Sequence, residues 1–289
     1  GLHPYQAGKP TDELERALGL TGIVKLASNE NPLGVGELVK AALEKELSGI
    51  TRYPDANGYY LKQALADKYD LAPGQFTLGN GSNDVLELIA RSFVTPEHEV
   101  IFAEHAFVVY PLVTQAIGAR GVAVPAKDWG HDLPAMLAAI TDNTRLIFIA
   151  NPNNPTGTFL TAEALYDFLN KVPEDVKVVL DEAYFESVDK ELQAPSITWL
   201  NTFSNLIITR TFSKAYGLAG LRVGYSMSHP DIADILNRVR QPFNCNSFAL
   251  AAAQAALSDH DFLTASVALN NEQRAVLETF FSEQGIDYI

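Results

Sequence analysis

The chain has 289 residues, of which 47% are apolar and 19% charged, and its formal net charge is −14 at pH 7. A chain of this length is expected to form about two domains and to bury a core without disulfides or a structural metal. Its 35 acidic residues outnumber the 21 lysines and arginines, which argues against nucleic acid as a partner because a phosphate backbone would be repelled.

Cysteine usage predicts a cytoplasmic location. Cys245 is the only cysteine, and no secretory leader is recognisable at the start of the sequence. The apolar stretches, such as Leu146–Ala150, are far shorter than the ~20 residues that a membrane-spanning helix requires. We therefore expect no membrane partner. The six histidines lack the spacing of metal ligands, so we also expect no metal.

In chain order, residues 1–35 are expected to form an irregular arm because prolines and glycines interrupt them. Over residues 36–242, short apolar runs alternate with segments of helical periodicity, which predicts one large α/β domain. The predicted strands are Gln75–Gly79, Glu99–Ala103, Arg145–Ala150, Val176–Asp181, Leu206–Arg210 and Val223–Met227. Helical spacing recurs over 61–69 and 232–239.

Two of the strands, within 146–150 and 178–180, are apolar at every position, which is typical of strands buried on both faces of a parallel sheet. The predicted fold is therefore a mostly parallel sheet flanked by helices. Beyond Pro242 the pattern is helical over 248–257 and 262–281, and Gly285 is placed to end the last helix. We expect residues 243–289 to begin a smaller C-terminal domain, with 286–289 resembling the start of an unpaired strand.

Ligands of open α/β sheets bind at the carboxyl ends of the strands, so the residues after each strand are candidates for a site. The segment Gly79–Asn83 leads into a helix whose free N–H groups favour an anion such as phosphate. The alternative is an ordinary helix start capped by Ser82. Residues 151–157 contain two Asn-Pro steps, which form either a tight turn or a loop with free asparagine side chains.

The next two strands end in charged residues. Asp181 follows a buried run, and such a carboxylate is costly to bury unless a cation or strong donor faces it. The last parallel strand leads into a segment of small and hydroxylated residues that holds Lys214 and Arg222. A phosphate cradle, a buried acid, an amine and the phenol of Tyr184 together favour pyridoxal phosphate, whose aldehyde reacts with lysine and whose pyridinium nitrogen requires an acidic partner.

Several segments together resemble the fold-type-I pyridoxal-phosphate aminotransferases, and among them the histidinol-phosphate aminotransferases: 3–10, 26–32, 52–55, 79–83, 154–157, 181–184 and 213–222. The resemblance implies amino transfer between histidinol phosphate and 2-oxoglutarate, giving imidazole-acetol phosphate and glutamate in histidine biosynthesis. Transamination of aromatic amino acids, or decarboxylation of a phosphorylated amino acid, is left open. So is a cofactor-binding fragment without turnover.

The resemblance also implies roles for individual residues. Lys214 would carry the cofactor as a Schiff base and move a proton, Asp181 would pair with the pyridinium nitrogen, and Tyr184 would bond the phenolate oxygen. Asn154 would share that oxygen with Tyr184 and contact the substrate. Further cofactor contacts are implied at Gly81, Ser82, Asn83, Phe107, Thr211, Ser213 and Arg222. For Phe107, expected to stack on the cofactor, a plain core position is the alternative.

Two tyrosines in the first quarter of the chain match family positions. Tyr53 corresponds to a tyrosine that reaches the phosphate of the neighbouring subunit, which implies a homodimer; the alternative is a surface residue packed near Pro54. Tyr5 lies in an arm that covers the substrate in relatives. The family also has C-terminal arginines for the substrate's carboxylate and phosphate, and because Arg274 matches neither position, the chain is expected to be incomplete as an enzyme.

Overall fold

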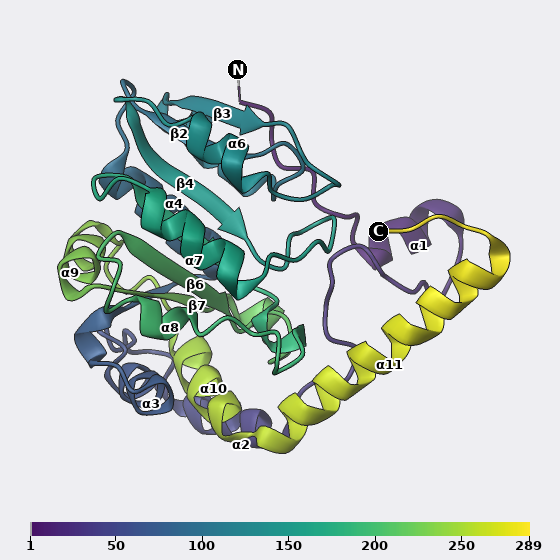
Figure 1. Ribbon diagram of the computed structural model, residues 1–289. Coiled ribbons are helices and arrows are strands. Elements are labelled where there is room, and N and C mark those ends of the chain that lie inside the picture. The colour runs from purple at the N-terminus through teal and green to yellow at the C-terminus, as the bar shows by residue number, and fades with distance from the viewer. Residues whose placement is uncertain (1) are drawn as a thin grey trace.

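The computed structural model describes residues 2–289 and contains a seven-stranded sheet with the order β1-β7-β6-β5-β4-β2-β3 (Figure 1). Only β7 runs antiparallel to its neighbours, β1 and β6, and the other pairings are parallel. The strands are β1 Phe76–Gly79, β2 Glu99–Ala103, β3 Arg120–Val124, β4 Thr144–Ala150, β5 Lys177–Asp181, β6 Leu206–Thr211 and β7 Gly224–Ser228. The predicted α/β class with a mostly parallel sheet is confirmed.

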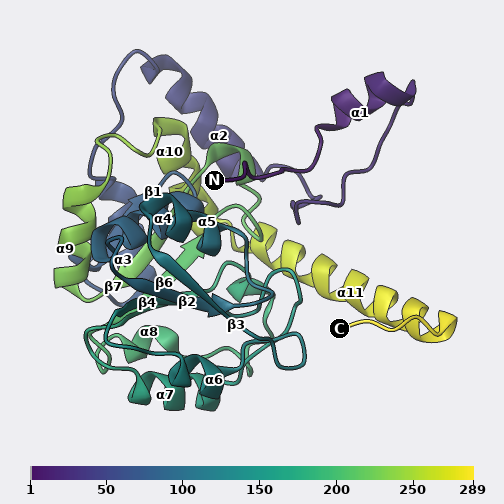
Figure 2. The same cartoon turned by 90° about the horizontal axis from the view of Figure 1, so that it is seen from above.

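Helices cover both faces of this sheet. The helices of the described chain are α1 Thr11–Leu18, α2 Glu37–Glu46, α3 Tyr59–Tyr69, α4 Ser82–Phe93, α5 Val109–Ile117, α6 Leu133–Ala138, α7 Ala162–Lys171, α8 Ser196–Trp199, α9 Pro230–Val239, α10 Ser247–Ser258 and α11 His260–Gln284. Figure 2 shows α6, α7 and α8 on one side of the strands and α4 and α5 on the other. Short 3₁₀ turns occupy Leu47–Gly49, Pro73–Gln75, Phe185–Ser187 and Ala219–Leu221.

The alternation of side chains along a strand explains the continuous apolar runs. Leu146 and Phe148 of β4 pack with residues of α4, α5 and α9, whereas Ile147 and Ile149 pack into the core that contains α6, α7 and α8. Because both faces are covered by helices, polar alternation would bury unpaired groups on one side. The second core continues to α2, α3 and α10, so the C-terminal segment α10 packs against helices from the first quarter of the chain.

All six predicted strands are present, with ends within one residue of those predicted. The edge strand β3 was missed because its apolar part is only three residues long and follows Arg120 and Gly121; most of its residues are exposed. The helix α1 was missed within the arm because it is only eight residues long and lies between the prolines and glycines that predicted an irregular segment; none of its residues is buried. Residues 286–289 form no strand.

The N-terminal arm and the last helix lie at the periphery of the structure. Gly285 ends α11 in the left-handed conformation at φ 65°, as expected. Both views show α11 and α1 extending away from the sheet (Figures 1 and 2). Among residues 2–289, no helix combines the length and apolarity needed to cross a bilayer. The boundaries at residues 35 and 242 stay predictions.

The strand order gathers the ends of separate chain segments at one edge of the sheet. The parallel strands β1 to β6 all end there, and β7 begins there because it runs in the opposite direction. Gly224, the first residue of β7, lies between Gly79 of β1 and Thr211 of β6 in the pairing register. A Cβ on Gly224 would lie 2.6 Å from the Ser82 backbone nitrogen and 3.0 Å from the Gly81 carbonyl carbon. The turn before α4 therefore rests directly on this glycine.

Replacing Gly224 by alanine should destabilise the protein, since the atoms that would clash are backbone atoms that cannot rotate away. We expect Gly224→Ala to lower the free energy of unfolding by about 1–3 kcal/mol, the usual cost of overpacking, as measured by urea unfolding. Gly74→Ala is the matched control, because an added Cβ there meets no atom within 4 Å. Similar unfolding curves for the two variants would contradict this account.

Candidate active site

A cavity of about 560 Å³ opens at the carboxyl edge of the sheet. Most residues predicted from the four strand ends line it together: Ser82, Asn83, Phe107, Asn154, Asp181, Tyr184, Thr211, Ser213, Lys214 and Arg222. The N-terminal arm closes one side, where residues 5–8 and 25–30 contribute to the lining. Segments that are far apart in sequence thus meet because their strands end at one edge.

One end of the cavity suits an anion. Helix α4 begins at Ser82, its N-cap is Gly81 at φ 86°, and no side chain caps its first N–H groups. The alternative interpretation of Ser82 as the capping residue is therefore wrong. Arg222 packs so closely over Gly81 that any Cβ at position 81 would collide with the guanidinium. Free first-turn N–H groups beside a guanidinium form a site for a phosphate or similar anion.

The Arg222 guanidinium is held in place by its own segment. It donates to the backbone oxygen of Ala219 at 3.0 Å and lies 3.5 Å from the Ser213 hydroxyl. The Thr211 hydroxyl accepts from the Ser213 N–H at 3.1 Å, which orders the turn after β6. These contacts leave the Ser213 hydroxyl and the other guanidinium nitrogens next to the start of α4, so the three groups share one anion-binding region.

Asp181 lies at the end of β5 and is 5% exposed. Its Oδ2 accepts from the Tyr110 hydroxyl at 2.6 Å and its Oδ1 from the Ala183 N–H at 3.2 Å. Burial raises the pKa of this carboxyl, and the groups that oppose the rise, Tyr110, Ala183 and Thr209, are all neutral donors. A buried acid supported only by neutral groups is arranged to receive a cation from the cavity.

The Lys214 amine lies across the cavity from the body of the sheet, against the arm. Its Nζ donates to the backbone oxygen of Ser28 at 2.8 Å. Burial lowers the pKa of Lys214, Glu30 opposes this effect, and the charges of Arg222 and Lys25 lower the pKa further. A lysine with a lowered pKa holds more neutral amine near pH 7 and is a better nucleophile.

The phenol of Tyr184 is also oriented by the arm. Asn29 donates to the Tyr184 hydroxyl at 3.0 Å, and the Lys214 Nζ lies 5.7 Å from the centre of the Tyr184 ring. Burial raises the pKa of Tyr184, so the phenol stays protonated and can donate to a ligand. The amine and the phenol therefore face the same part of the cavity.

The asparagine-rich loop after β4 positions Asn154. Asn151 exchanges hydrogen bonds with the backbone of Leu160 at 2.7 and 3.1 Å. Asn153 donates to the His105 carbonyl at 2.9 Å and to the Thr156 hydroxyl at 2.7 Å. The loop combines both interpretations: Asn151 and Asn153 stabilise the turn, whereas Asn154 lines the cavity.

Three aromatic residues predicted for the site have different surroundings. Phe107 lines the cavity and packs edge-on against Tyr110, with ring centres 5.9 Å apart, so it is more than a core residue. Tyr5 also lines the cavity from the arm. Tyr53 does not line this cavity; it is 83% exposed and stacks on Phe243 at 4.7 Å. Within one chain, the structure does not bring Tyr53 to the other site residues.

The chain is similar to known proteins over most of its length. The family model for class I and II aminotransferases matches residues 21–289. A histidinol-phosphate aminotransferase of Idiomarina loihiensis is 62% identical over 288 residues, covering all of this chain and 78% of that protein. Another from Pasteurella multocida is 59% identical and is covered to 79%. The chain belongs to the histidinol-phosphate aminotransferase family.

A solved structure agrees with this assignment. The crystal structure of histidinol-phosphate aminotransferase from Sinorhizobium meliloti, in complex with pyridoxal-5'-phosphate, superposes with a TM-score of 0.90 at 31% identity. The match covers 97% of this chain and 76% of that one. This aminotransferase therefore has the family's fold, and the cofactor of the family is pyridoxal phosphate.

The residues of this aminotransferase fit that cofactor chemically. The uncapped N-terminus of α4 and the Arg222 guanidinium suit a phosphate group. The Asp181 carboxylate, which has only neutral hydrogen-bond donors around it, suits a pyridinium nitrogen. The Lys214 amine, with its lowered pKa, matches an aldehyde. Each reactive part of the cofactor thus has a partner of complementary chemistry in one cavity.

Some residues of the site were missed in the sequence. Ser28 and Asn29 lie in a segment that carried the family resemblance, but no pattern indicated that they bond Lys214 and Tyr184. Tyr110 was missed although it lies three positions after Phe107, close to one helical turn. That spacing is a weak signal, because only the packing of α5 on the sheet brings the Tyr110 hydroxyl to Asp181.

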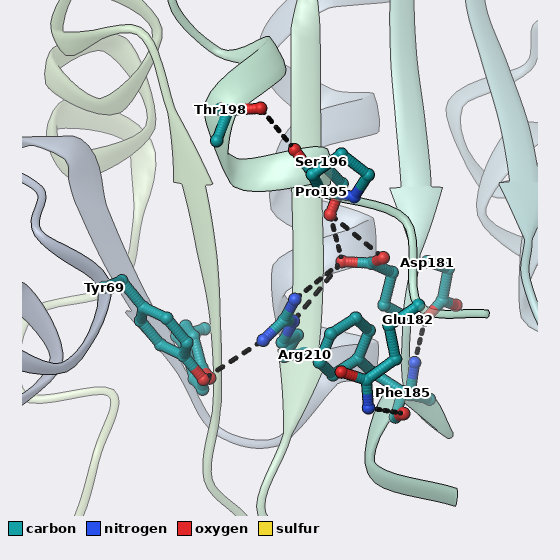
Figure 3. A network of polar contacts seen from close by, with 11 residues as sticks. Tyr69, Asp181, Glu182, Phe185, Pro195, Ser196, Thr198 and Arg210 are labelled. Atoms are coloured by element: carbon teal, nitrogen blue, oxygen red, sulfur yellow. Dashed lines mark hydrogen bonds and ion pairs between the residues drawn. The ribbon is translucent and has the colours of Figure 1, made fainter. Parts of the chain in front are cut away.

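A buried ion pair lies on the opposite face of the same strand ends (Figure 3). Glu182 and Arg210, each 3% exposed, are 3.1 Å apart, and Ser196 donates to both carboxylate oxygens of Glu182. Arg210 also donates to the Tyr69 hydroxyl at 3.2 Å and lies 3.7 Å above the Phe185 ring. Because Glu182 follows Asp181 and Arg210 precedes Thr211, the pair joins the ends of β5 and β6 behind the cavity.

Removing one charge of this pair should be costly, because the other charge would stay buried without its partner. We expect Glu182→Gln to lower the free energy of unfolding by about 3–5 kcal/mol, measured by urea unfolding without cofactor. The control is Asp167→Asn in the exposed Lys171–Asp167 pair, which should cost no more than about 1 kcal/mol. A cost for Glu182→Gln as small as that of the control would show that the pair is not a structural link.

Proposed function

We propose that this aminotransferase transfers the amino group of histidinol phosphate to 2-oxoglutarate with pyridoxal phosphate as cofactor, in histidine biosynthesis. The observation that carries the proposal is the single cavity in which Lys214, Asp181 and Arg222 meet. Support for the substrate comes from relatives of that name at 62% and 59% identity over the whole chain. A cytoplasmic location, suited to such a biosynthetic reaction, is part of the proposal.

The ends of the cofactor would be held by the groups described above. The first-turn N–H groups at Ser82 and Asn83, the hydroxyls of Thr211 and Ser213, and Arg222 would bind the phosphate. Gly81 permits this by leaving space for the guanidinium. Asp181 would pair with the ring nitrogen, and Phe107 would stack on the ring. Pyridoxal phosphate, when bound, supplies an electron sink for negative charge at the substrate's α-carbon.

Proton movement would fall to Lys214. Its Nζ would attach the cofactor, and once released it would take the proton from the substrate's α-carbon and return it to the cofactor's aldehyde carbon. The Tyr184 hydroxyl and the Asn154 amide would donate to the phenolate oxygen beside that centre. Both are held by hydrogen bonds in their surroundings, Tyr184 through Asn29 and the Asn154 loop through its other asparagines.

Substrate contacts would come from Tyr5 in the arm and from Asn154. Both side chains line the cavity that contains Lys214. While the amine is free, the arm is held against this cavity by the bonds from Lys214 to Ser28 and from Asn29 to Tyr184. Its position would exclude water from the amine while leaving an opening for the substrate.

The preferred substrate is tested with a panel of amino donors. Histidinol phosphate should give a kcat/KM for glutamate formation on the order of 10²-fold above that of phenylalanine, since discrimination rises when a site has polar groups for the correct substrate. O-phosphothreonine should release no carbon dioxide. Lys214→Ala should abolish both the transfer and the visible absorbance that follows cofactor attachment.

Lys177→Ala is the control for the lysine variant. Burial lowers the pKa of Lys177 as it does that of Lys214, but Lys177 begins β5 at the opposite edge of the sheet. It should keep cofactor binding and transfer near the unaltered level. Transfer by Lys214→Ala at a near-native rate, or a preference for phenylalanine, would overturn the proposal.

We infer further that the enzyme is a homodimer in which Tyr53 reaches the phosphate of the neighbouring subunit. The supporting observation is that Tyr53 is 83% exposed, stacks on the Phe243 ring and does not line the cavity of its own chain. A large aromatic group kept in this exposed position suits a contact with a second copy.

Shared sites are tested by mixing two inactive variants, Tyr53→Ala and Lys214→Ala. In a mixed dimer, the site that contains the intact Lys214 also receives the intact Tyr53 of the other subunit, so activity should return to about a quarter of the unaltered level after random subunit exchange. The readout is glutamate formation before and after exchange. Tyr59→Ala with Lys214→Ala is the control mixture. No recovery in the first mixture would place Tyr53 outside the neighbouring site.

A further inference from the structure

We propose that Tyr110 is a positioning residue of this enzyme, holding the Asp181 carboxylate ionised and aimed at the cavity. The inference rests on the role of Asp181 in the proposed function. Tyr110 itself belongs to none of the sequence motifs that resemble the family. The geometry that supports the inference is a 2.6 Å hydrogen bond between two buried side chains, from the Tyr110 hydroxyl to Asp181 Oδ2.

The direction of this hydrogen bond is determined by the surroundings. Tyr110 is fully buried, and burial together with the Asp181 charge raises the pKa of its phenol well above the usual value. The phenol therefore keeps its proton and can only act as the donor, while the carboxylate accepts. Hydrogen bonds from a hydroxyl to an ionised oxygen are short and are among the stronger ones in proteins.

The tyrosine is rigidly held, so it can define where the carboxylate points. Its ring stacks on Phe148 of β4 with ring centres 4.5 Å apart and planes 3° from parallel. Its backbone oxygen accepts from the Thr114 hydroxyl at 2.8 Å within α5. With Oδ2 bonded to Tyr110 and Oδ1 to the Ala183 N–H, the carboxylate plane is anchored at both oxygens.

The same residue links two groups of the site. Phe107, which would stack on the cofactor ring, packs edge-on against Tyr110 at 5.9 Å. Tyr110 thus contacts both the aromatic residue beside the cofactor plane and the acid at the ring nitrogen. A change at its hydroxyl acts on Asp181 alone, because both ring contacts stay intact when only the oxygen is removed.

The test is Tyr110→Phe, which deletes the hydroxyl and keeps the ring. We expect the dissociation constant of pyridoxal phosphate, titrated into cofactor-free protein at pH 6, to rise by about tenfold to a hundredfold, the range for a lost hydrogen bond to a charged group. Tyr225→Phe is the matched control, since Tyr225 is also fully buried and its hydroxyl lies 2.7 Å from that of Tyr69.

A second readout separates positioning from a general loss of stability. Without the hydroxyl, the pKa of Asp181 should rise further, so more of it is protonated at low pH and the ratio of variant to unaltered dissociation constants should fall from pH 6 to pH 8.5. The other titratable groups that interact with the Asp181 charge, Tyr184 and Glu182, are unchanged in both variants. Thermal unfolding of the cofactor-free proteins reports stability separately.

Failure of this inference is distinguishable from failure of the proposed function. Asp181→Asn should weaken cofactor binding whether or not Tyr110 matters; if it does not, the role of Asp181 and the proposed function are wrong. A second outcome is that Asp181→Asn weakens binding while the dissociation constant for Tyr110→Phe stays within twofold of the unaltered value, or rises no more than for Tyr225→Phe. That result would exclude the positioning role of Tyr110. If the dissociation constant for Tyr110→Phe rises by the same large factor at pH 6 and pH 8.5, the effect on the ionisation of Asp181 is excluded.

Discussion

The burial of a carboxylate at the end of β5 is the constraint on which the site depends. Asp181 is 5% exposed and is supported by neutral donors, so its charge is tolerated only where hydrogen bonds surround it and a cation can approach. The Tyr110 hydroxyl from α5 and the Ala183 N–H provide those bonds. The packing of α5 on the sheet is thereby tied to the chemistry of the cavity.

The pleat of the sheet separates two charged systems that lie one residue apart in sequence. Asp181 and Thr209, opposite each other in the register, lie on the face covered by α4 and α5. Glu182 and Arg210, the next residues on each strand, lie on the other face and pair with each other (Figure 3). Because side chains alternate along a strand, the ion pair can brace the strand ends without neutralising Asp181.

The arm and the loops complete the cavity by hydrogen bonds to polar groups of the site. Ser28 accepts from Lys214, and Asn29 donates to Tyr184, so an irregular segment determines the surroundings of both reactive side chains. Tyr5, Ala7 and Gly8 of the same arm line the cavity. The start of α4 contributes in a comparable way, since the close contact of Gly81 with Arg222 and of Gly224 with Ser82 brings three separate segments into one anion-binding region.

The sequence by itself determined six of the strands, the helices with clear apolar periodicity, the parallel character of the sheet and the residues at its carboxyl ends, because apolar runs and turn residues are local patterns. It did not reveal β3 or α1, which bury little, nor the partners of Lys214, Tyr184 and Asp181. Those partners, Ser28, Asn29 and Tyr110, are 186, 155 and 71 positions away. Only tertiary packing decides such distant pairings, because no local pattern encodes which side chains a folded sheet edge brings together.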